Sequence, residues 1–325
     1  MKDIVTIGGG TGQFTLLTGF KRFPVHLTAI VAMADDGGST GMLRDELGVL
    51  PPGDIRQCLV ALSDSELVMR ELFKYRFDKG KLEGHNFGNI FLSALEKITG
   101  SFEEAVRVAG MVLSIRGEVI PVATSDMILV GGQNGELRGQ HTIELATIVD
   151  RDSFELEPEA FANPKAVIAI EKADCIVIGP GNLYCSIVPN LLVHGISEAI
   201  ARSRATVVYN CNLMNRAGHT DGFGVSDFVA EIERYIGGGR IDYVTFNSEV
   251  PPDELLERYA IEREFPVLPP DNLEAPISHA IPLAAQLVSS GKCVRKSGDP
   301  IKRSLIRHDS DMLADLIVQN CLGGL

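Results

Sequence analysis

The sequence predicts an α/β protein with a three-layer α/β/α, Rossmann-like architecture and a mostly parallel sheet. Short, near-continuous apolar runs rich in β-branched residues alternate with segments of helical periodicity over most of the 325 residues. This alternation is typical of buried parallel strands joined by crossover helices. Each apolar run is stopped by Gly, Asp or Asn, as strand ends usually are. We expect residues 1–325 to form a single domain of this kind.

The elements follow in chain order from the same two periodicities. The predicted strands are Ile4–Ile7, Leu27–Met33, Cys175–Ile178, Thr206–Tyr209 and Tyr243–Phe246. The predicted helices are Phe14–Arg22, Asp54–Ser63, Asn89–Thr99, Phe102–Ser114, Ile187–Ser203, Ser226–Tyr235 and a final Ser310–Cys321. Strands and helices that alternate in this way are connected by right-handed crossovers, which place helices on both faces of the sheet.

One stretch departs from the alternation. Met127–Val130 and Glu136–Leu145 alternate like the arms of an antiparallel hairpin, with Asn134-Gly135 at the turn between them. Asn-Gly is a strongly favoured pair for tight hairpin turns. We therefore expect a small antiparallel β excursion over about residues 118–150.

Composition excludes several classes of partner. The chain is 45% apolar and carries a formal net charge of −13, so a nucleic-acid backbone is not an expected partner. No apolar run approaches the roughly 20 residues that a membrane-spanning helix needs, so no membrane partner is expected. Six cysteines without a C-x-x-C pair suit a reducing compartment, and a cytoplasmic location is expected. A homodimer is the assembly expected from its frequency among soluble proteins.

The first glycine loop follows the first predicted strand directly. Gly8–Gly12 contains four glycines around Thr11, and a strand-to-helix turn of this kind directs backbone N–H groups toward an anion. The loop lacks the Gly-Lys-Ser/Thr ending of a P-loop. It is also an imperfect dinucleotide fingerprint, because Gln13 stands where Gly or Ala is usual. A tight structural turn is the alternative interpretation.

Adjacent Asp35 and Asp36 follow the second predicted strand and lead into a loop over residues 37–41. One acid at this point would hold the ribose of a nicotinamide cofactor. Two carboxylates could instead bind Mg²⁺ through one or two oxygens and water, and an Asx-type turn is the structural alternative. Ser39 and Thr40 add hydroxyls to this second loop.

Further polar loops follow. Arg56 lies in the first turn of a helix that we expect Asp54 to cap, where a cation opposes the helix dipole, so it could hold an anionic ligand or form a surface salt bridge. His85 and Asn86 precede a helix expected to begin near Gly88 or Asn89. Other candidates are Gly179–Asn182 and, after the next strand, Asn210, Asn212, Arg216, His219 and Asp221. Because the carboxyl ends of parallel strands meet at one edge, these loops predict one shared crevice.

Several motifs place the chain in a known family. "IGGGTG", "ADDGGSTGMLR", "LPPGDIRQCLVAL", "IGPGNLYCSIVPNLL" and "NLMNRAGHTDGF" resemble, in this order, the gluconeogenesis factor (YvcK-like) family. That family is related to 2-phospho-L-lactate transferase. The "PPGDIR" and "GPGNLY" segments resemble the gluconeogenesis factor branch, and "GHNFGN" departs slightly from the usual wording at Asn86-Phe87.

The resemblance implies a cytoplasmic regulatory protein that binds nucleotide sugars such as UDP-N-acetylglucosamine. The implied role is in cell shape and envelope-precursor supply on gluconeogenic carbon, with no obligatory cofactor. The related transferase uses Mg²⁺, and the resemblance places its aspartates at Asp35 and Asp36, which would be the metal-binding and catalytic residues if the chain is an enzyme.

Three functions follow: the nucleotide-sugar-binding regulator, a Mg²⁺-dependent phosphotransferase, and a nicotinamide-dinucleotide-binding protein, against which Gln13 counts. The chain has no H-E-x-x-H motif, and the family branch that the motifs resemble favours the regulator. The predicted ligand-binding residues, most of which the first two functions would share, are Gly9, Gly10, Thr11, Gly12, Asp36, Gly37, Gly38, Ser39, Arg56, His85, Asn86, Asn89, Gly179, Pro180, Gly181, Asn182, Leu183, Tyr184, Asn212 and Asp221.

Overall fold

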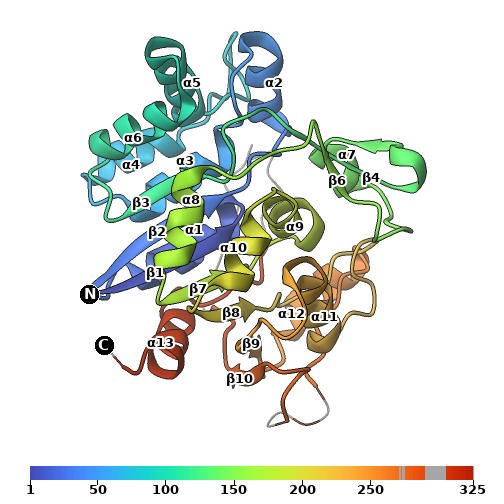
Figure 1. The fold of residues 1–325 in the computed structure, drawn as a ribbon. Helices are drawn as coiled ribbons and strands as arrows, with labels where there is room; N and C mark the ends of the chain where they lie inside the picture. The colour runs from blue at the N-terminus through green and yellow to red at the C-terminus, as the bar shows by residue number, and fades with distance from the viewer. Residues whose placement is uncertain (271, 273–274, 290–304, 325) are drawn as a thin grey trace.

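A seven-stranded sheet forms the centre of the molecule (Figure 1). The computed structural model describes residues 1–270, 272, 275–289 and 305–324. The strand order is β10-β9-β8-β7-β1-β2-β3, and every neighbouring pair is parallel. The strands are β1 (Lys2–Gly8), β2 (Val25–Val31), β3 (Glu118–Pro121), β7 (Cys175–Ile178), β8 (Thr206–Asn210), β9 (Tyr243–Asn247) and β10 (Ile281–Ala285). The predicted mostly parallel α/β fold is confirmed.

The order of the strands reverses direction between β1 and β7. From β1 the chain proceeds outward through β2 to β3, and from β7 it proceeds the other way through β8 and β9 to β10. Right-handed crossovers therefore place the connecting helices of the two halves on opposite faces of the sheet. The carboxyl ends of β1 and β7 are the topological switch point, where open α/β sheets bind their ligands.

The helices pack in two layers that follow this topology. On one face α1 (Gly10–Phe20) packs against α3 (Gly53–Leu62) and α13 (Ser310–Cys321). On the other face α8 (Pro164–Lys172) packs against α10 (Ile196–Arg202), which also contacts α11 (Val225–Ile236). Figure 1 shows α8 and α10 in front of the sheet. The remaining helices are α2 (Gly38–Leu47), α4 (Leu67–Lys74), α5 (Phe87–Thr99), α6 (Phe102–Val112), α7 (Gln140–Leu145), α9 (Val188–Leu191) and α12 (Asp253–Ile261).

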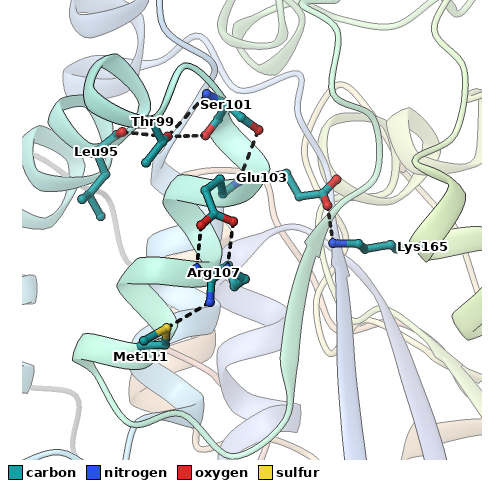
Figure 2. Close-up of polar contacts among 8 residues, drawn as sticks. Leu95, Thr99, Ser101, Glu103, Arg107, Met111 and Lys165 are labelled. Atoms are coloured by element: carbon teal, nitrogen blue, oxygen red, sulfur yellow. Dashed lines mark hydrogen bonds and ion pairs between the residues drawn. The ribbon is translucent and has the colours of Figure 1, made fainter.

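Helix α6 illustrates how local sequence fixes the boundary of an element (Figure 2). The Ser101 hydroxyl accepts a hydrogen bond from the Glu104 N–H at 3.3 Å, which caps the helix start. Arg107, one turn further, donates to both Glu104 carboxylate oxygens at 2.6 and 2.8 Å. Lys165 at the start of α8 forms an ion pair with Glu103. The helix begins at Phe102, as predicted.

The small antiparallel sheet is present, but its bounds differ from the prediction. Its order is β5 (Leu137–Arg138), β4 (Ile128–Gly131), β6 (Glu155–Glu157). Asn134 adopts the left-handed conformation at the turn, with φ 61°, as an Asn-Gly turn requires. The excursion begins after residue 121, because β3 pairs with β2 in the main sheet.

Three further predictions about elements need correction. The expected second hairpin arm shortens to two residues, and the rest of it forms α7, while β6 supplies the third strand. The predicted helix Ile187–Ser203 is divided into a π-helical turn (Leu183–Ile187), α9 and α10, because Gly195 takes φ 101° and interrupts the run. Strand β10 was not predicted, since Pro282 and only partial burial hide its strand character.

No helix in the described part of the chain is long and apolar enough to cross a membrane.

Candidate functional site

The loops after β1 and β7 touch each other at the switch point. A Cβ atom built on Gly12 would lie 1.7 Å from the carbonyl oxygen of Pro180, so only glycine permits this contact. Gly9 is the N-cap of α1 and has no side chain to cap the helix, while the Asp54 carboxylate accepts from the Gly10 N–H. The backbone N–H groups at its start are therefore oriented toward the carboxyl edge of the sheet, as in helix-terminus anion sites.

Gln13, which stands where the dinucleotide fingerprint has Gly or Ala, has a structural role in the core. Its side chain is fully buried, and its amide nitrogen donates to the Ile30 carbonyl at 2.7 Å and the Gly8 carbonyl at 3.2 Å. Its oxygen accepts a short hydrogen bond from the Thr6 hydroxyl. Asn190, also fully buried, donates to the Gly8 carbonyl from the other side at 3.2 Å. Gln13 and Asn190 together fix the point where the glycine loop leaves β1.

The second glycine loop is largely the start of a helix. Residues 38–41 form the first turn of α2, whose N-cap is Gly37, and no described side chain caps it. Thus α1 and α2 both begin with glycines directly after neighbouring parallel strands, β1 and β2. Two helix N-termini at one sheet edge provide more N–H donors for an anion than either alone.

Asp35 points toward the start of α3. Its carboxylate accepts from the Gly37 N–H at 3.0 Å and from the Thr40 hydroxyl. A Cβ on Gly53 would lie 2.7 Å from Asp35 Oδ2 and 2.5 Å from Thr40 Oγ1, so α3 packs closely on this group. Burial, and secondly the charge of Asp36, raises the pKa of Asp35 despite these hydrogen bonds.

Asp54 is the site residue whose role the sequence prediction missed. It was expected to cap α3, but the N-cap is Pro52, and Asp54 lies inside the first turn. Its carboxylate accepts from the Gly10 N–H, and burial together with the nearby Asp35 charge raises its pKa to about 7. The sequence signal was available, since Asp54 stands between Pro51-Pro52 and Arg56 in a polar loop. A divalent cation would be stabilised beside two neighbouring carboxyl groups of this kind.

Asp36 turns away from its neighbour and holds the small sheet. Its Oδ1 accepts from the His141 N–H at 2.8 Å, in the first turn of α7. A Cβ on Gly139 would lie 2.2 Å from Asp36 Oδ2, so the contact requires glycine there. The two adjacent aspartates therefore make different contacts: Asp35 lies near Asp54, and Asp36 caps the start of α7.

Five predicted residues meet in one buried polar cluster. The Ser39 hydroxyl accepts from the Asn86 N–H at 3.2 Å and the Asn89 amide at 3.4 Å, and it lies 3.5 Å from His85 Nδ1. Arg56 is only 9% exposed and donates to Asn89 Oδ1 at 2.8 Å, so its guanidinium lies in this buried cluster. Asn86 is the N-cap of α5, earlier than predicted. The cluster joins the starts of α2, α3 and α5.

The third glycine loop contains both accessible and core residues. Asn182 accepts from the Cys185 N–H at 3.2 Å and caps the π-helical turn. Leu183 and Tyr184 are buried, and Tyr184 stacks on Phe154 with ring centroids 4.9 Å apart. Their side chains therefore pack in the core, and a ligand at this loop would meet backbone rather than the tyrosine ring.

Asn212 completes this edge. Its amide nitrogen donates to the Gly181 carbonyl at 2.9 Å, whereas its buried Oδ1 has no hydrogen-bond partner among the described residues. Buried acceptors are normally satisfied, so an orphaned one beside the glycine loops indicates a missing donor. Asp221, by contrast, is exposed and accepts from the Gly218 N–H at 2.7 Å within its own loop.

Helix α7 contacts the loop after β8 through two of its residues, Ile143 and Glu144. His219 Nε2 lies 3.0 Å from the Ile143 carbonyl, and burial lowers the pKa of His219. Arg216 pairs with Glu144 at 3.7 Å and with Glu264 at 2.9 Å. Together with Asp36, these contacts connect the excursion to the loops after β2 and β8.

The switch point, the parallel order and the paired glycine loops define a Rossmann-like α/β protein. A family model described as 2-phospho-L-lactate transferase CofD matches residues 4–281. The gluconeogenesis factor of Bacillus subtilis (strain 168) is 40% identical over 320 residues, which cover 97% of this chain and 96% of that protein. The gluconeogenesis factor of Halalkalibacterium halodurans is 43% identical over 270 residues, covering 82% of this chain and 84% of that protein.

A solved structure agrees with these relatives. The crystal structure of protein BH3568 from Bacillus halodurans superposes with a TM-score of 0.87 at 38% identity, covering 98% of this chain and 99% of that one. The chain therefore belongs to the CofD family, and its relatives over nearly the whole length are gluconeogenesis factors. The resemblance that the motifs indicated is confirmed.

Proposed function

We propose that this gluconeogenesis factor binds a nucleotide sugar, with UDP-N-acetylglucosamine as the first candidate, at the carboxyl edge of the sheet. The observation that carries the proposal is the contact between Gly12 and Pro180, which joins two glycine loops at the switch point. The starts of α1 and α2 would receive the diphosphate through their N–H groups.

Polar side chains beside these loops suit the rest of such a ligand. The unsatisfied Asn212 Oδ1 would accept a hydrogen bond from a hydroxyl or N–H of the ligand. Asp35 would accept from sugar hydroxyls. In an acidic protein of net charge −13, the backbone N–H donors at the helix starts are needed to hold the anionic diphosphate.

The same proposal assigns a regulatory rather than a catalytic role. The amount of bound nucleotide sugar would reflect how much envelope precursor the cell makes on gluconeogenic carbon. The ligand-bound protein would then act in the cytoplasm to maintain cell shape. A sensor needs no nucleophile paired with a base. It requires only that ligand binding alter a surface that a downstream partner contacts.

A second candidate, a Mg²⁺-dependent phosphotransferase, is favoured by one specific observation. The charge of Asp35 raises the pKa of the buried Asp54, and a divalent cation between the two carboxyl groups would relieve this repulsion. No group of three or more ligating side chains occurs among the described residues, so any such cation would be held by few protein ligands. Mg²⁺ fits such a site, because it is commonly held by one or two carboxylates and water. Asp36 fits less well, since its carboxylate already caps α7. Mg²⁺ would stabilise charge on a transferred phosphoryl group.

Calorimetric titration with UDP-N-acetylglucosamine, with and without Mg²⁺, tests the first proposal, and NAD serves as the comparison ligand. We expect the nucleotide sugar to bind and NAD to give no heat of binding. Asn212→Asp provides a matched variant, because it keeps the shape but adds a negative charge beside the ligand. No binding of the nucleotide sugar at millimolar concentration would contradict the proposal.

The two candidates separate with Asp54→Asn. If Mg²⁺ serves turnover, this variant retains sugar-nucleotide binding but loses Mg²⁺-dependent release of product. If the protein only senses, wild type and variant both return the nucleotide sugar unchanged after long incubation with Mg²⁺.

A further inference from the structure

A cavity lies beside α11, away from the glycine loops. Helix α11 itself is at the lower right of Figure 1. Its volume is about 310 Å³, which is at the lower end of the range for small-molecule sites. None of the predicted site residues lines it. The lining residues are Ser226, Ala230, Glu233, Pro270, Asn272, Ala275, Pro276, Ile277 and Ser278.

Among the described residues that line the cavity, Glu233 is the only one with an ionisable side chain. It is 7% exposed, and its carboxylate accepts two long hydrogen bonds, from the Ile241 N–H at 3.5 Å and the Ser278 hydroxyl at 3.3 Å. Within the part of the chain that the structure describes, Glu233 forms no ion pair. Buried carboxylates are almost always paired with a cation, so this one lacks the partner that its burial calls for.

We propose that this cavity binds a small aliphatic primary amine, whose ammonium group pairs with Glu233. An ammonium group supplies three N–H donors, and the carboxylate has lone pairs left after its two long hydrogen bonds. The Ser278 hydroxyl, already 3.3 Å from the carboxylate, lies within reach of the same ammonium. A charge-assisted hydrogen bond of this type is about twice as strong as a neutral one.

The other walls select an aliphatic stem. Ala230, Pro276 and Ile277 present methyl and methylene groups to the same space, and a short hydrocarbon chain would bury its surface against them. A bare metal ion fits poorly, because one carboxylate and hydroxyls leave most of this volume unfilled. Mg²⁺ and Ca²⁺ also require several oxygen ligands.

The site is separate from the one proposed for the nucleotide sugar. The cavity is bordered by α11 and the segment that leads to β10, whereas the glycine loops follow β1, β2 and β7. Failure of one proposal therefore leaves the other intact.

Titration of the full chain with n-butylamine, monitored by calorimetry and thermal shift, tests the proposal, with n-butanol as the neutral analogue at equal ionic strength. We expect butylamine to bind and butanol to bind at least ~10-fold more weakly, because only the amine can pair with the carboxylate. Glu233→Gln keeps the side-chain shape and removes the charge, so it should weaken butylamine binding by a similar factor.

Two further variants keep the test decisive if Glu233→Gln is poorly folded. Ala230→Leu fills the cavity with a good helix former and leaves Glu233 in place, and it should abolish binding. Glu257→Gln removes the same charge from an exposed position on α12 and should leave binding unchanged. The proposal is overturned if Ala230→Leu binds butylamine as tightly as wild type does. It is also overturned if wild type binds no butylamine at about 10 mM.

Discussion

The carbonyl oxygen of Pro180 occupies the space that a side chain on Gly12 would need, at 1.7 Å from the position of its Cβ. This contact joins the first turn of α1 to the loop after β7. It therefore holds together the two halves of the sheet at the edge where the strand order reverses. The proposed ligand site depends on this junction.

Gly12→Ala should separate the two loops. The added methyl group must displace backbone rather than a flexible side chain, so we expect destabilisation of about 2 kcal/mol or more and loss of nucleotide-sugar binding. Gly238→Ala is the matched control, because a Cβ there meets nothing within 4 Å. Urea unfolding and calorimetry measure both effects, and a Gly12→Ala protein with wild-type affinity and midpoint would show that the loops move apart freely.

Asp54 should make the protein less stable as pH rises. Its pKa is raised to about 7 in the folded state from an ordinary 3.8, so between these values the folded state binds more protons than the unfolded state. Stability therefore falls as pH increases from about 4 to 7. Asp54→Asn should raise the free energy of unfolding on the order of 1 kcal/mol at pH 8 and change it little at pH 4. Parallel pH profiles for the two proteins would contradict the assignment.

Asp36→Ala should loosen α7 without unfolding the main sheet. Loss of an N-cap acceptor costs about 1 kcal/mol, and amide hydrogen exchange at residues 141–145 should accelerate selectively. Asp36→Asn retains an acceptor for the His141 N–H and serves as the conservative control. Uniform exchange changes across the chain, or none, would argue against a specific link between Asp36 and the small sheet.

Gln13→Ala should not create a dinucleotide site, although it restores the usual fingerprint residue. The substitution leaves the Ile30 carbonyl without the amide at 2.7 Å and opens a cavity beside β1. We expect destabilisation of about 2–4 kcal/mol and still no NAD binding. Detection of NAD binding to the variant, measured by calorimetry, would mean that Gln13 alone excludes the cofactor.

The parallel strands and most helix positions were predictable because they depend on local patterns. β7 was predicted at Cys175–Ile178 and α13 at Ser310–Cys321, and both have those bounds. Strand β10 was not predictable, because Pro282 and exposed positions make it resemble a loop. The break at Gly195 was hidden for another reason: apolar residues on both sides continue the helical pattern.

The contacts that each predicted site residue makes in the fold could not be derived from the sequence. Asp35 and Asp36 look equivalent in sequence, yet tertiary contacts send one to Asp54 and the other to α7. Arg56 and Ser39, which are predicted ligand contacts, belong to one buried polar cluster with Asn89 in the fold. Side-chain direction depends on contacts between residues distant in sequence, which no local pattern records.

A crystal structure of the protein with UDP-N-acetylglucosamine tests the central claim most directly. The account predicts diphosphate density against the N–H groups of Gly9–Gly12, with a ligand donor within hydrogen-bond distance of Asn212 Oδ1. Ligand density elsewhere on the chain, with the Asn212 acceptor still unsatisfied and the glycine loops empty, would contradict it.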